Sequence, residues 1–191
     1  MLPTGLSFTG VSDKAMAAHA NARLHRFYFD WTMMVNRPQK SFIGTIPINI
    51  FYGLRESIRL LDEEGLDNVI ARHTRLAEAT RRAVQVWAGN NGPQLFCMTP
   101  DRYSNSVTAV LMPDGFSGDA LRKTVRDRFN VSLGGGLGKL SGKIFRIGHL
   151  GDLNEPMLLG ALSAIEMALR IDAVPHGRGG VEAAMAYLAG D

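Results

Sequence analysis

The sequence has few of the features that mark secreted or membrane proteins. Cys97 is the only cysteine among 191 residues, so no disulfide can form within the chain, which fits a reducing compartment. No window approaches the roughly 18 consecutive apolar residues of a membrane-spanning helix. The first ten residues, MLPTGLSFTG, lack the basic start, apolar stretch and cleavage site of a secretory signal. These absences predict a cytoplasmic protein with no membrane partner.

A concentrated basic region is also missing. The net charge is +3 and the isoelectric point is about 9.2, values that could suggest a nucleic-acid partner. The sixteen arginines and five lysines, however, are spread along helical segments, usually near an acidic residue, without a dense basic run or interleaved aromatics. We therefore expect no nucleic acid as a partner.

Several motifs of catalytic and metal-binding proteins are absent. Residues 132–143, SLGGGLGKLSGK, fit neither the P-loop nor G-x-G-x-x-G, and we interpret them as a flexible hairpin or a backbone approach to a ligand. No G-x-S-x-G motif is present. No histidine has zinc-ligand spacing from another histidine or from Cys97, so no metal is expected. His73, in an apolar helical stripe, and Cys97, in an apolar strand, are interpreted as packing residues.

Composition and hydrophobic periodicity predict a globular chain whose first part is mainly helical. Apolar residues make up 46% and charged residues 20%, which is enough for a hydrophobic core. The predicted segments are a strand at 6–9, a helix at 13–26 capped by Ser12, an extended aromatic segment at 27–31, a loop at 36–44, a helix starting near Thr45 and ended by Gly65, and a helix at 68–88 capped by Asp67. These helices have little sheet to cover, which indicates that strands come from elsewhere or from a partner.

The second part predicts a self-contained α+β unit after the breaker at 89–93. The predicted strands are 94–98, 106–112, 131–133 and 143–148, and the predicted helices are 118–129, capped by Ser117, 155–172, capped by Asn154, and 180–189. Strands and helices in this order predict a two-layer fold with helices on one face of a largely antiparallel sheet. The fold class is therefore α/β, and α+β in the C-terminal part.

Arg146 is the residue with the clearest chemical potential. It interrupts the otherwise apolar strand 143–148 and is followed by a glycine-containing loop. An alternating strand can also send such a residue to solvent without a role. At a strand end, however, a guanidinium can hold a carboxylate through two parallel hydrogen bonds. Amino acids and keto acids carry such a carboxylate, so Arg146 is the candidate substrate-binding residue.

A family resemblance begins at this arginine and extends along the whole chain. FRIGHLGD at 145–152 resembles the carboxylate-binding strand of serine–glyoxylate and alanine–glyoxylate aminotransferases, which belong to class V and fold type I. Further segments resemble that family in order along the chain: MLPTGLSFTGVSDKA at 1–15, GTIPINIFYGLRESI at 44–58, EGLDNVIARH at 64–73, VSLGGGLGKLSGK at 131–143 and VPHGRGGVEAAM at 174–185. The resemblance implies the C-terminal half of such an enzyme.

The resemblance also implies roles for individual residues. Arg146 would bind the α-carboxylate of the amino or keto acid. Thr45, at a helix N-terminus, would contact the phosphate of pyridoxal 5′-phosphate held by the other subunit of a homodimer, where free N–H groups favour an anion. Phe42 stands where many relatives place a tyrosine whose hydroxyl also reaches that phosphate, so this hydrogen bond is lost.

The resemblance places the cofactor-binding lysine just before Met1. None of the five lysines in the chain, Lys14, Lys40, Lys123, Lys139 and Lys143, matches it. The acid that pairs with the pyridine nitrogen is likewise expected upstream, so no catalytic residue is assigned and no covalent cofactor is expected here.

The implied domains are a remnant of the cofactor-binding large domain at 1–66, a small two-layer domain at 67–175 and a helical tail at 176–191. The expected function is that of an aminotransferase fragment, inactive alone, which in the intact family transfers an amino group from serine or alanine to glyoxylate. The alternative is a non-catalytic dimerisation or regulatory module derived from that family.

Overall fold

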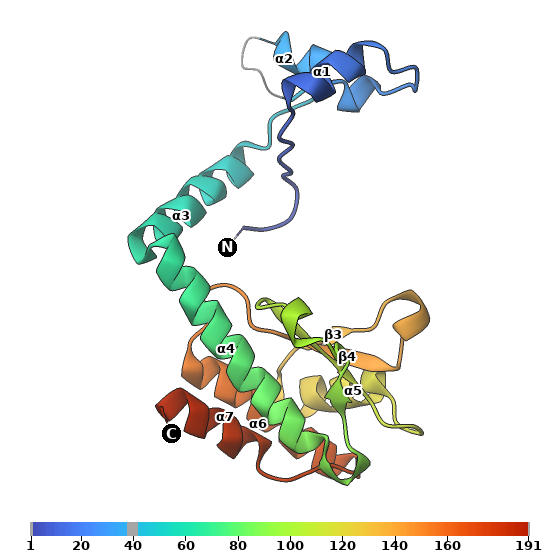
Figure 1. Ribbon diagram of the computed structural model, residues 1–191, viewed down its shortest axis with the longest axis vertical. Helices are drawn as coiled ribbons and strands as arrows, with labels where there is room; N and C mark the ends of the chain where they lie inside the picture. The colour runs from blue at the N-terminus through green and yellow to red at the C-terminus, as the bar shows by residue number, and fades with distance from the viewer. Residues whose placement is uncertain (1, 38–41, 191) are drawn as a thin grey trace. The chain divides into compact units, whose positions relative to one another are not determined.

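The computed structural model describes residues 2–37 and 42–190, and the chain divides into two compact units. The first is Met1–Glu63 and the second is Glu64–Asp191. Figure 1 shows the helices and strands of both units. Among the described residues, no helix has the length and apolar character needed to cross a membrane.

Three α-helices make up the regular structure described in the first unit. These are α1 (Asp13–Ala20), α2 (Trp31–Val35) and α3 (Ile48–Glu64). Ser12 caps α1 as predicted, since its Oγ accepts a hydrogen bond from the Ala15 amide at 3.2 Å. Asp30 caps α2 in the same way, through the Met33 amide at 2.9 Å.

Three sequence predictions for the first unit are wrong. Residues 6–9 form no strand, because an isolated alternating segment needs a partner strand and none is described in this unit. The predicted extended segment at 27–31 is instead the 3-10 turn Phe27–Phe29 followed by α2, which the Asp30 cap nucleates. The helix predicted at 13–26 ends at Ala20.

The apolar residues of α3 remain uncovered within the described first unit. None of its side chains is buried, and Ile48, Tyr52 and Ile58 are all about half exposed or more. The periodicity that predicted a buried face is present, but no sheet lies under it in this unit. This observation agrees with the expectation that the helix is covered by chain from elsewhere.

Four α-helices belong to the second unit. These are α4 (Leu66–Trp87), α5 (Gly118–Phe129), α6 (Glu155–Ile171) and α7 (Gly180–Ala189). Ser117 and Asn154 cap α5 and α6 as predicted, through the Ala120 amide at 3.4 Å and the Met157 amide at 3.0 Å. Asp67 was expected to cap α4 but lies in its first turn, because Gly65, at φ +83°, occupies the capping position.

The sheet has four strands in the order β1-β2-β4-β3, all antiparallel. They are β1 (Gln94–Leu95), β2 (Val107–Leu111), β3 (Gly134–Gly135) and β4 (Ile144–Gly148). The antiparallel sheet is confirmed, although β1 is shorter than expected. The strand predicted at 131–133 is wrong: pairing with β4 occurs at the two glycines that follow, where no side chain obstructs it.

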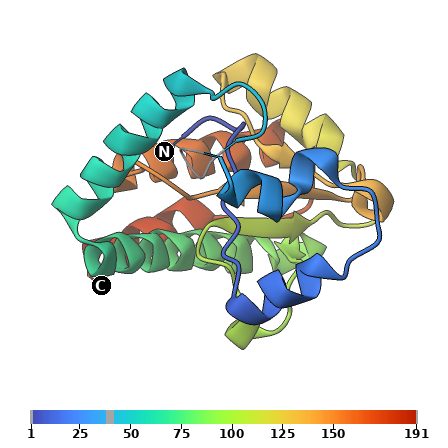
Figure 2. The same cartoon turned by 90° about the horizontal axis from the view of Figure 1, so that it is seen from above.

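One core lies between the helices and the inner face of the sheet. Its largest fully buried side chains include Trp87 of α4, Phe145 of β4 and Leu162 of α6. Helix α4 contacts β1 and β2, and α5 contacts β3 and β4. Helix α7 packs along α4, and Figures 1 and 2 both show these two helices side by side. The predicted placement of helices on one face of the sheet is therefore confirmed.

Candidate functional site

Arg146 lies at the centre of β4, between two neighbouring strands. Its Cα is paired with Ala109 of β2 and with Gly134 of β3. Its Nε donates a hydrogen bond to the Gly135 carbonyl oxygen at 2.8 Å. Within residues 2–37 and 42–190, neither terminal nitrogen of Arg146 donates a hydrogen bond. The guanidinium is thus anchored at one nitrogen and keeps its two-pronged end for a ligand.

Strand alternation separates Arg146 from the hydrophobic core. Phe145 and Ile147, which flank it, are 0% and 1% exposed and belong to the core cluster. Successive side chains of a strand point to opposite faces, so Arg146 lies on the outer face. The side chain is half-buried there, not extended into water. A half-buried guanidinium gives stronger directional hydrogen bonds than a freely solvated one.

The glycine-rich hairpin allows backbone to approach two arginines. A Cβ atom on Gly134 would lie 3.1 Å from Nε of Arg146, and one on Gly135 would lie 2.6 Å from a terminal nitrogen of Arg122. Arg122 of α5 also donates through Nε to the Leu133 carbonyl at 2.8 Å. The sequence predicts a flexible hairpin or a backbone approach to a ligand here; among the described residues, the groups that lie closest to Gly134 and Gly135 are arginine side chains.

His149 fixes the chain directly after β4. It is 0% exposed, with Nδ1 hydrogen-bonded to the Asn105 carbonyl at 3.0 Å and Nε2 to Thr108 Oγ1 at 2.9 Å. A carbonyl accepts only, so Nδ1 carries the proton and the Thr108 hydroxyl donates to Nε2. Burial lowers the pKa of His149 to about 4; the Asn105 hydrogen bond raises it by less than burial lowers it, and the positive charge of Arg81 makes a smaller lowering contribution. His149 is therefore neutral at physiological pH.

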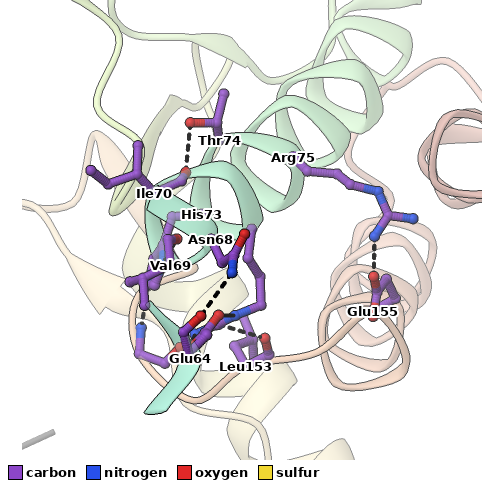
Figure 3. A network of polar contacts seen from close by, with 11 residues as sticks. Glu64, Asn68, Val69, Ile70, His73, Thr74, Arg75, Leu153 and Glu155 are labelled. Atoms are coloured by element: carbon purple, nitrogen blue, oxygen red, sulfur yellow. Dashed lines mark hydrogen bonds and ion pairs between the residues drawn. The ribbon is translucent and has the colours of Figure 1, made fainter. Parts of the chain in front are cut away.

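Two consecutive residues of α4 hold the next turn of this loop (Figure 3). His73 accepts a hydrogen bond from the Gly151 amide at 2.8 Å, while its Nδ1 bonds the Val69 carbonyl at 2.6 Å. Arg72 donates to the carbonyls of Gly151 and Leu153 at 2.7 and 3.1 Å. Both backbone groups of Gly151, at φ +104°, are thus held. His73 is buried as predicted, and it also positions the backbone amide of Gly151.

Arg72 is itself fixed by a carboxylate. Its Nε and one terminal nitrogen donate to the two oxygens of Glu64 at 2.6 and 2.8 Å. This hydrogen bonding raises the pKa of Arg72 and lowers that of Glu64. The network of Glu64, Arg72 and His73 therefore immobilises the loop that leaves the Arg146 strand.

Thr45 is placed differently from the expectation. Helix α3 begins at Ile48, three residues later, because Pro47 disfavours helical dihedrals in Ile46, the residue before it. Thr45 is exposed, and its hydroxyl makes no hydrogen bond to another described residue. The Phe42 ring packs edge-on against Phe51 of α3 at 5.8 Å between centroids. Thr45 thus precedes the helix start instead of forming it.

The lysines have no environment suited to a covalent cofactor. Lys14, Lys123, Lys139 and Lys143 are all exposed, and Lys123 pairs with Asp127 at 2.6 Å. A lysine that forms an imine is normally desolvated or placed beside another cation, so that its amine is partly deprotonated. The described lysines do not meet this requirement, and Lys40 lies outside the described residues. The residues present fit a phosphate contact but not the covalent attachment of pyridoxal phosphate.

A solved structure identifies the class of protein to which this fold corresponds. Pyridoxamine–pyruvate aminotransferase from Mesorhizobium loti matches 94% of this chain and 46% of its own, with a TM-score of 0.80 and 30% identity. The fold is therefore that of part of a fold type I aminotransferase, as predicted.

Curated sequences narrow this class. The serine–glyoxylate aminotransferase of Methylorubrum extorquens is 45% identical over 98% of this chain and 48% of the relative. That of Arabidopsis thaliana is 42% identical over 98% and 46%. No family model matches the chain. The predicted relationship is confirmed: the chain is related to the class V aminotransferases of the serine–glyoxylate and alanine–glyoxylate kind, and it spans about half the length of the curated relatives it matches, corresponding to their C-terminal half.

Sequence reasoning missed the residues that hold the loop after Arg146. His149 and Gly151 stand inside the quoted FRIGHLGD motif, so a closer reading of that motif could have indicated them. Arg72 and Glu64 are far from it in the sequence and look like ordinary helix-surface charges. No local pattern distinguishes them, because their contacts to residues 151–153 depend on the tertiary fold.

Proposed function

We propose that this chain supplies the substrate-carboxylate contact of a pyridoxal phosphate-dependent aminotransferase that moves an amino group from serine or alanine to glyoxylate. The observation that carries the proposal is the state of Arg146, anchored through Nε to the Gly135 carbonyl at 2.8 Å and otherwise unbonded within the described residues. In this proposal residues 1–66 are part of the cofactor-binding large domain, 67–175 are the small domain and 176–191 are a tail.

The geometry of Arg146 suits a ligand shared by donor and acceptor. Serine, alanine and glyoxylate differ in size and charge, but each carries a carboxylate beside the reacting carbon. A guanidinium accepts such a group through two parallel hydrogen bonds, which fixes orientation as well as position. Holding the carboxylate in this way places the neighbouring carbon for reaction and removes rotational freedom before chemistry.

Thr45 is proposed to contact the cofactor phosphate of the other subunit in a homodimer. Its exposed hydroxyl, unbonded to other described residues, is available to an anion from outside the unit. The first turn of α3 adds amide groups and a favourable helix dipole nearby. Phe42 cannot contribute a hydroxyl, so of these two residues only Thr45 offers the phosphate a side-chain hydrogen bond.

We further propose that the chain alone does not catalyse transamination. When bound, pyridoxal phosphate supplies the electron sink that makes the amino acid α-hydrogen acidic. The lysine that attaches the cofactor and moves this proton is not among the described lysines, which are all exposed. The chain therefore binds and orients a carboxylate, and a second polypeptide segment must provide the amine.

Complementation by the missing half tests this proposal. The chain would be co-expressed with the N-terminal half of the Methylorubrum extorquens relative, and transfer from serine to glyoxylate would be measured. Arg146→Ala should raise KM for glyoxylate roughly 100-fold, as expected for loss of a bidentate charge-assisted contact. Cofactor absorbance should be retained, and Arg146→Lys should restore only part of the affinity.

Two outcomes would contradict the proposal. Equal loss of cofactor absorbance and glyoxylate use in Arg146→Ala would indicate a structural arginine, and Arg126→Ala, which changes an exposed arginine of α5, is the matched control. Transamination by the purified chain alone, or an imine band reducible by borohydride, would contradict inactivity. Association with an intact relative without any transfer activity would favour the alternative, a non-catalytic dimerisation or regulatory module.

A further inference from the structure

A second arginine-containing cavity lies among α4, the segment that follows β1, and β2. It has a volume of about 200 Å³, and its walls include Arg81, Leu95, Cys97, Arg102, Tyr103 and Val107. The cavity forms because β1 pairs with β2 only over Gln94–Leu95, and the chain then leaves the sheet before returning at Val107. Cys97, which the sequence places inside a strand, lies in this departing segment; it lines the cavity, and its thiol donates to the Thr99 carbonyl at 3.5 Å.

Arg81 is the most deeply buried charge at this cavity, with 7% exposure. Its Nε donates to Glu78 Oε2 at 3.1 Å, and one terminal nitrogen makes a long hydrogen bond of 3.4 Å to the Ser104 carbonyl. The Tyr103 ring centroid lies 5.0 Å from its guanidinium carbon. Among the described residues, the other terminal nitrogen has no hydrogen-bond partner. Donor capacity of a buried arginine therefore remains available at the cavity.

The lining of this cavity includes two arginines, Arg81 and Arg102, and no acidic residue among the described residues. Glu78 is the carboxylate that pairs with Arg81, but it also accepts a hydrogen bond from Arg82 at 3.2 Å. One carboxylate is thus shared by two guanidinium groups, and Arg102 adds a third cation at the cavity wall. A positive charge that is removed from water favours an anion that can approach it.

We propose that this cavity binds a small carboxylate with a short apolar body. The guanidinium of Arg81 matches the planar carboxylate, and Leu95 and Val107 offer apolar walls to the carbon chain. The volume is below the ~300–1,000 Å³ of sites for drug-sized ligands, so it suits a molecule of few heavy atoms. Arg81 lies on α4 and Arg146 on β4, and Arg146 is not among the residues that line this cavity. The two arginines therefore define separate sites.

The single cysteine provides a direct test with the full chain. Iodoacetate is itself a small carboxylate, and iodoacetamide is its neutral analogue. Each alkylates Cys97 when the thiolate attacks the methylene carbon, a C–S bond forms and iodide leaves with the bonding electrons. If the cavity binds carboxylates, the rate ratio of iodoacetate to iodoacetamide at Cys97 should exceed that measured for glutathione by about tenfold.

Protection by butyrate separates a site from a general field effect. Butyrate should slow alkylation by neutral iodoacetamide in a saturable manner, by about tenfold when its concentration is ten times Kd. Butanol, which has the same carbon chain without the charge, should not protect. Protection that rises without saturation, or equal protection by butanol, would overturn the proposal. Protection by sulfate equal to that by butyrate would overturn the carboxylate assignment.

Variants assign the effect to Arg81. Arg81→Gln removes the charge and should abolish butyrate protection, while Arg126→Gln, an exposed arginine of α5, should retain it. Arg102→Gln, at the cavity wall, should weaken protection about threefold, as for loss of a partly screened charge. Thermal melting by circular dichroism checks that each variant is folded. If Arg81→Gln does not fold, the wild-type comparison of butyrate with butanol still decides the question.

Discussion

Gly134 and Arg146 face each other across the β3–β4 ladder, and a Cβ atom on Gly134 would lie 3.1 Å from both Cβ and Nε of Arg146. The glycine hairpin is therefore shaped around the arginine side chain. Gly134 does not have a positive φ, so backbone strain does not require a glycine at this position. The glycine is explained by the space that the Arg146 side chain occupies.

Substitution of Gly134 tests this relationship. Gly134→Val should displace the Arg146 guanidinium and break its 2.8 Å hydrogen bond to Gly135. In the complemented enzyme, KM for glyoxylate should rise by roughly tenfold, in line with loss of one charge-assisted hydrogen bond. In the chain alone, NMR should show loss of a protected arginine Nε–H resonance. Gly160→Ala, where an added Cβ meets nothing within 4 Å, is the control. An unchanged Nε–H resonance in Gly134→Val would contradict this account.

The buried His149 predicts a pH dependence of stability. Its folded pKa is about 4, below the ordinary value of 6.5, because burial disfavours the charged imidazolium. The stability that it contributes is complete above pH 6.5, and it is lost as the pH falls towards 4, because the unfolded state takes up the proton first. The shift corresponds to at most about 3 kcal/mol of unfolding free energy.

Urea denaturation between pH 7 and pH 4.5 measures this effect. His149→Gln can keep hydrogen bonds to Thr108 and Asn105 without titrating, so its unfolding free energy should fall less steeply with decreasing pH than that of the wild type. His25→Gln changes an exposed histidine and should leave the wild-type slope intact. Parallel slopes for wild type and His149→Gln would show that His149 does not titrate in this way.

The sequence predicts helices whose signals are local and misplaces features that depend on tertiary contact. Helix α5 begins at Gly118 as predicted, because the Ser117 cap and the apolar spacing are both encoded within one segment. The sequence does not predict the strand at Gly134–Gly135, because glycine has a low strand propensity. The two glycines form a strand because β4, which contains Arg146, pairs with them.

The same distinction holds for the candidate site. Arg146 could be selected from sequence as a charge in an apolar strand, and the family motif supported it. Its anchoring by the Gly135 carbonyl could not, because this contact depends on the pairing of β3 with β4. The support of the following loop by Arg72 and His73 could not either, because these contacts join residues 79 and 78 positions apart. The sequence predicts a helix start near Thr45, but α3 begins at Ile48, because Pro47 disfavours helical dihedrals in the residue before it.

Removal of the Arg72 side chain should loosen the loop that follows β4. Arg72→Ala deletes the hydrogen bonds to the carbonyls of Gly151 and Leu153 as well as the pair with Glu64, and should lower the unfolding free energy by about 2 kcal/mol. Hydrogen exchange at residues 151–153 should accelerate. Arg59→Ala removes two exposed carboxylate contacts that hold no backbone and should change neither quantity. Unaltered exchange at 151–153 in Arg72→Ala would refute a positioning role.

The carboxylate of Glu166 anchors the start of α7. It accepts hydrogen bonds from the Gly179 and Val181 amides at 3.0 and 2.9 Å, and from Trp87 Nε1 at 3.1 Å. Burial by itself would raise the pKa of Glu166, but the hydrogen bonds from Trp87, Val181 and Gly179 outweigh it and lower the pKa. The carboxylate therefore stabilises the fold above the pKa of an unfolded glutamate, and this contribution is lost as the pH falls through the lowered folded value.

Glu166→Gln places an amide NH₂ among the N–H donors of Trp87, Gly179, Val181 and Arg170 and should lower the unfolding free energy at pH 7 by about 3 kcal/mol. The difference from wild type should shrink as the pH falls below the ordinary glutamate value of 4.5 and through the lowered folded pKa of Glu166, because the wild-type carboxylate then loses its charge. Glu182→Gln, an exposed glutamate in the first turn of α7, is the matched control and should be close to wild type at both pH values. If the unfolding free energy of Glu166→Gln stayed below that of the wild type by the same amount from pH 7 to pH 3, the loss would be a packing effect. A loss caused by the charge must change over this range, because Glu166 titrates and the glutamine does not.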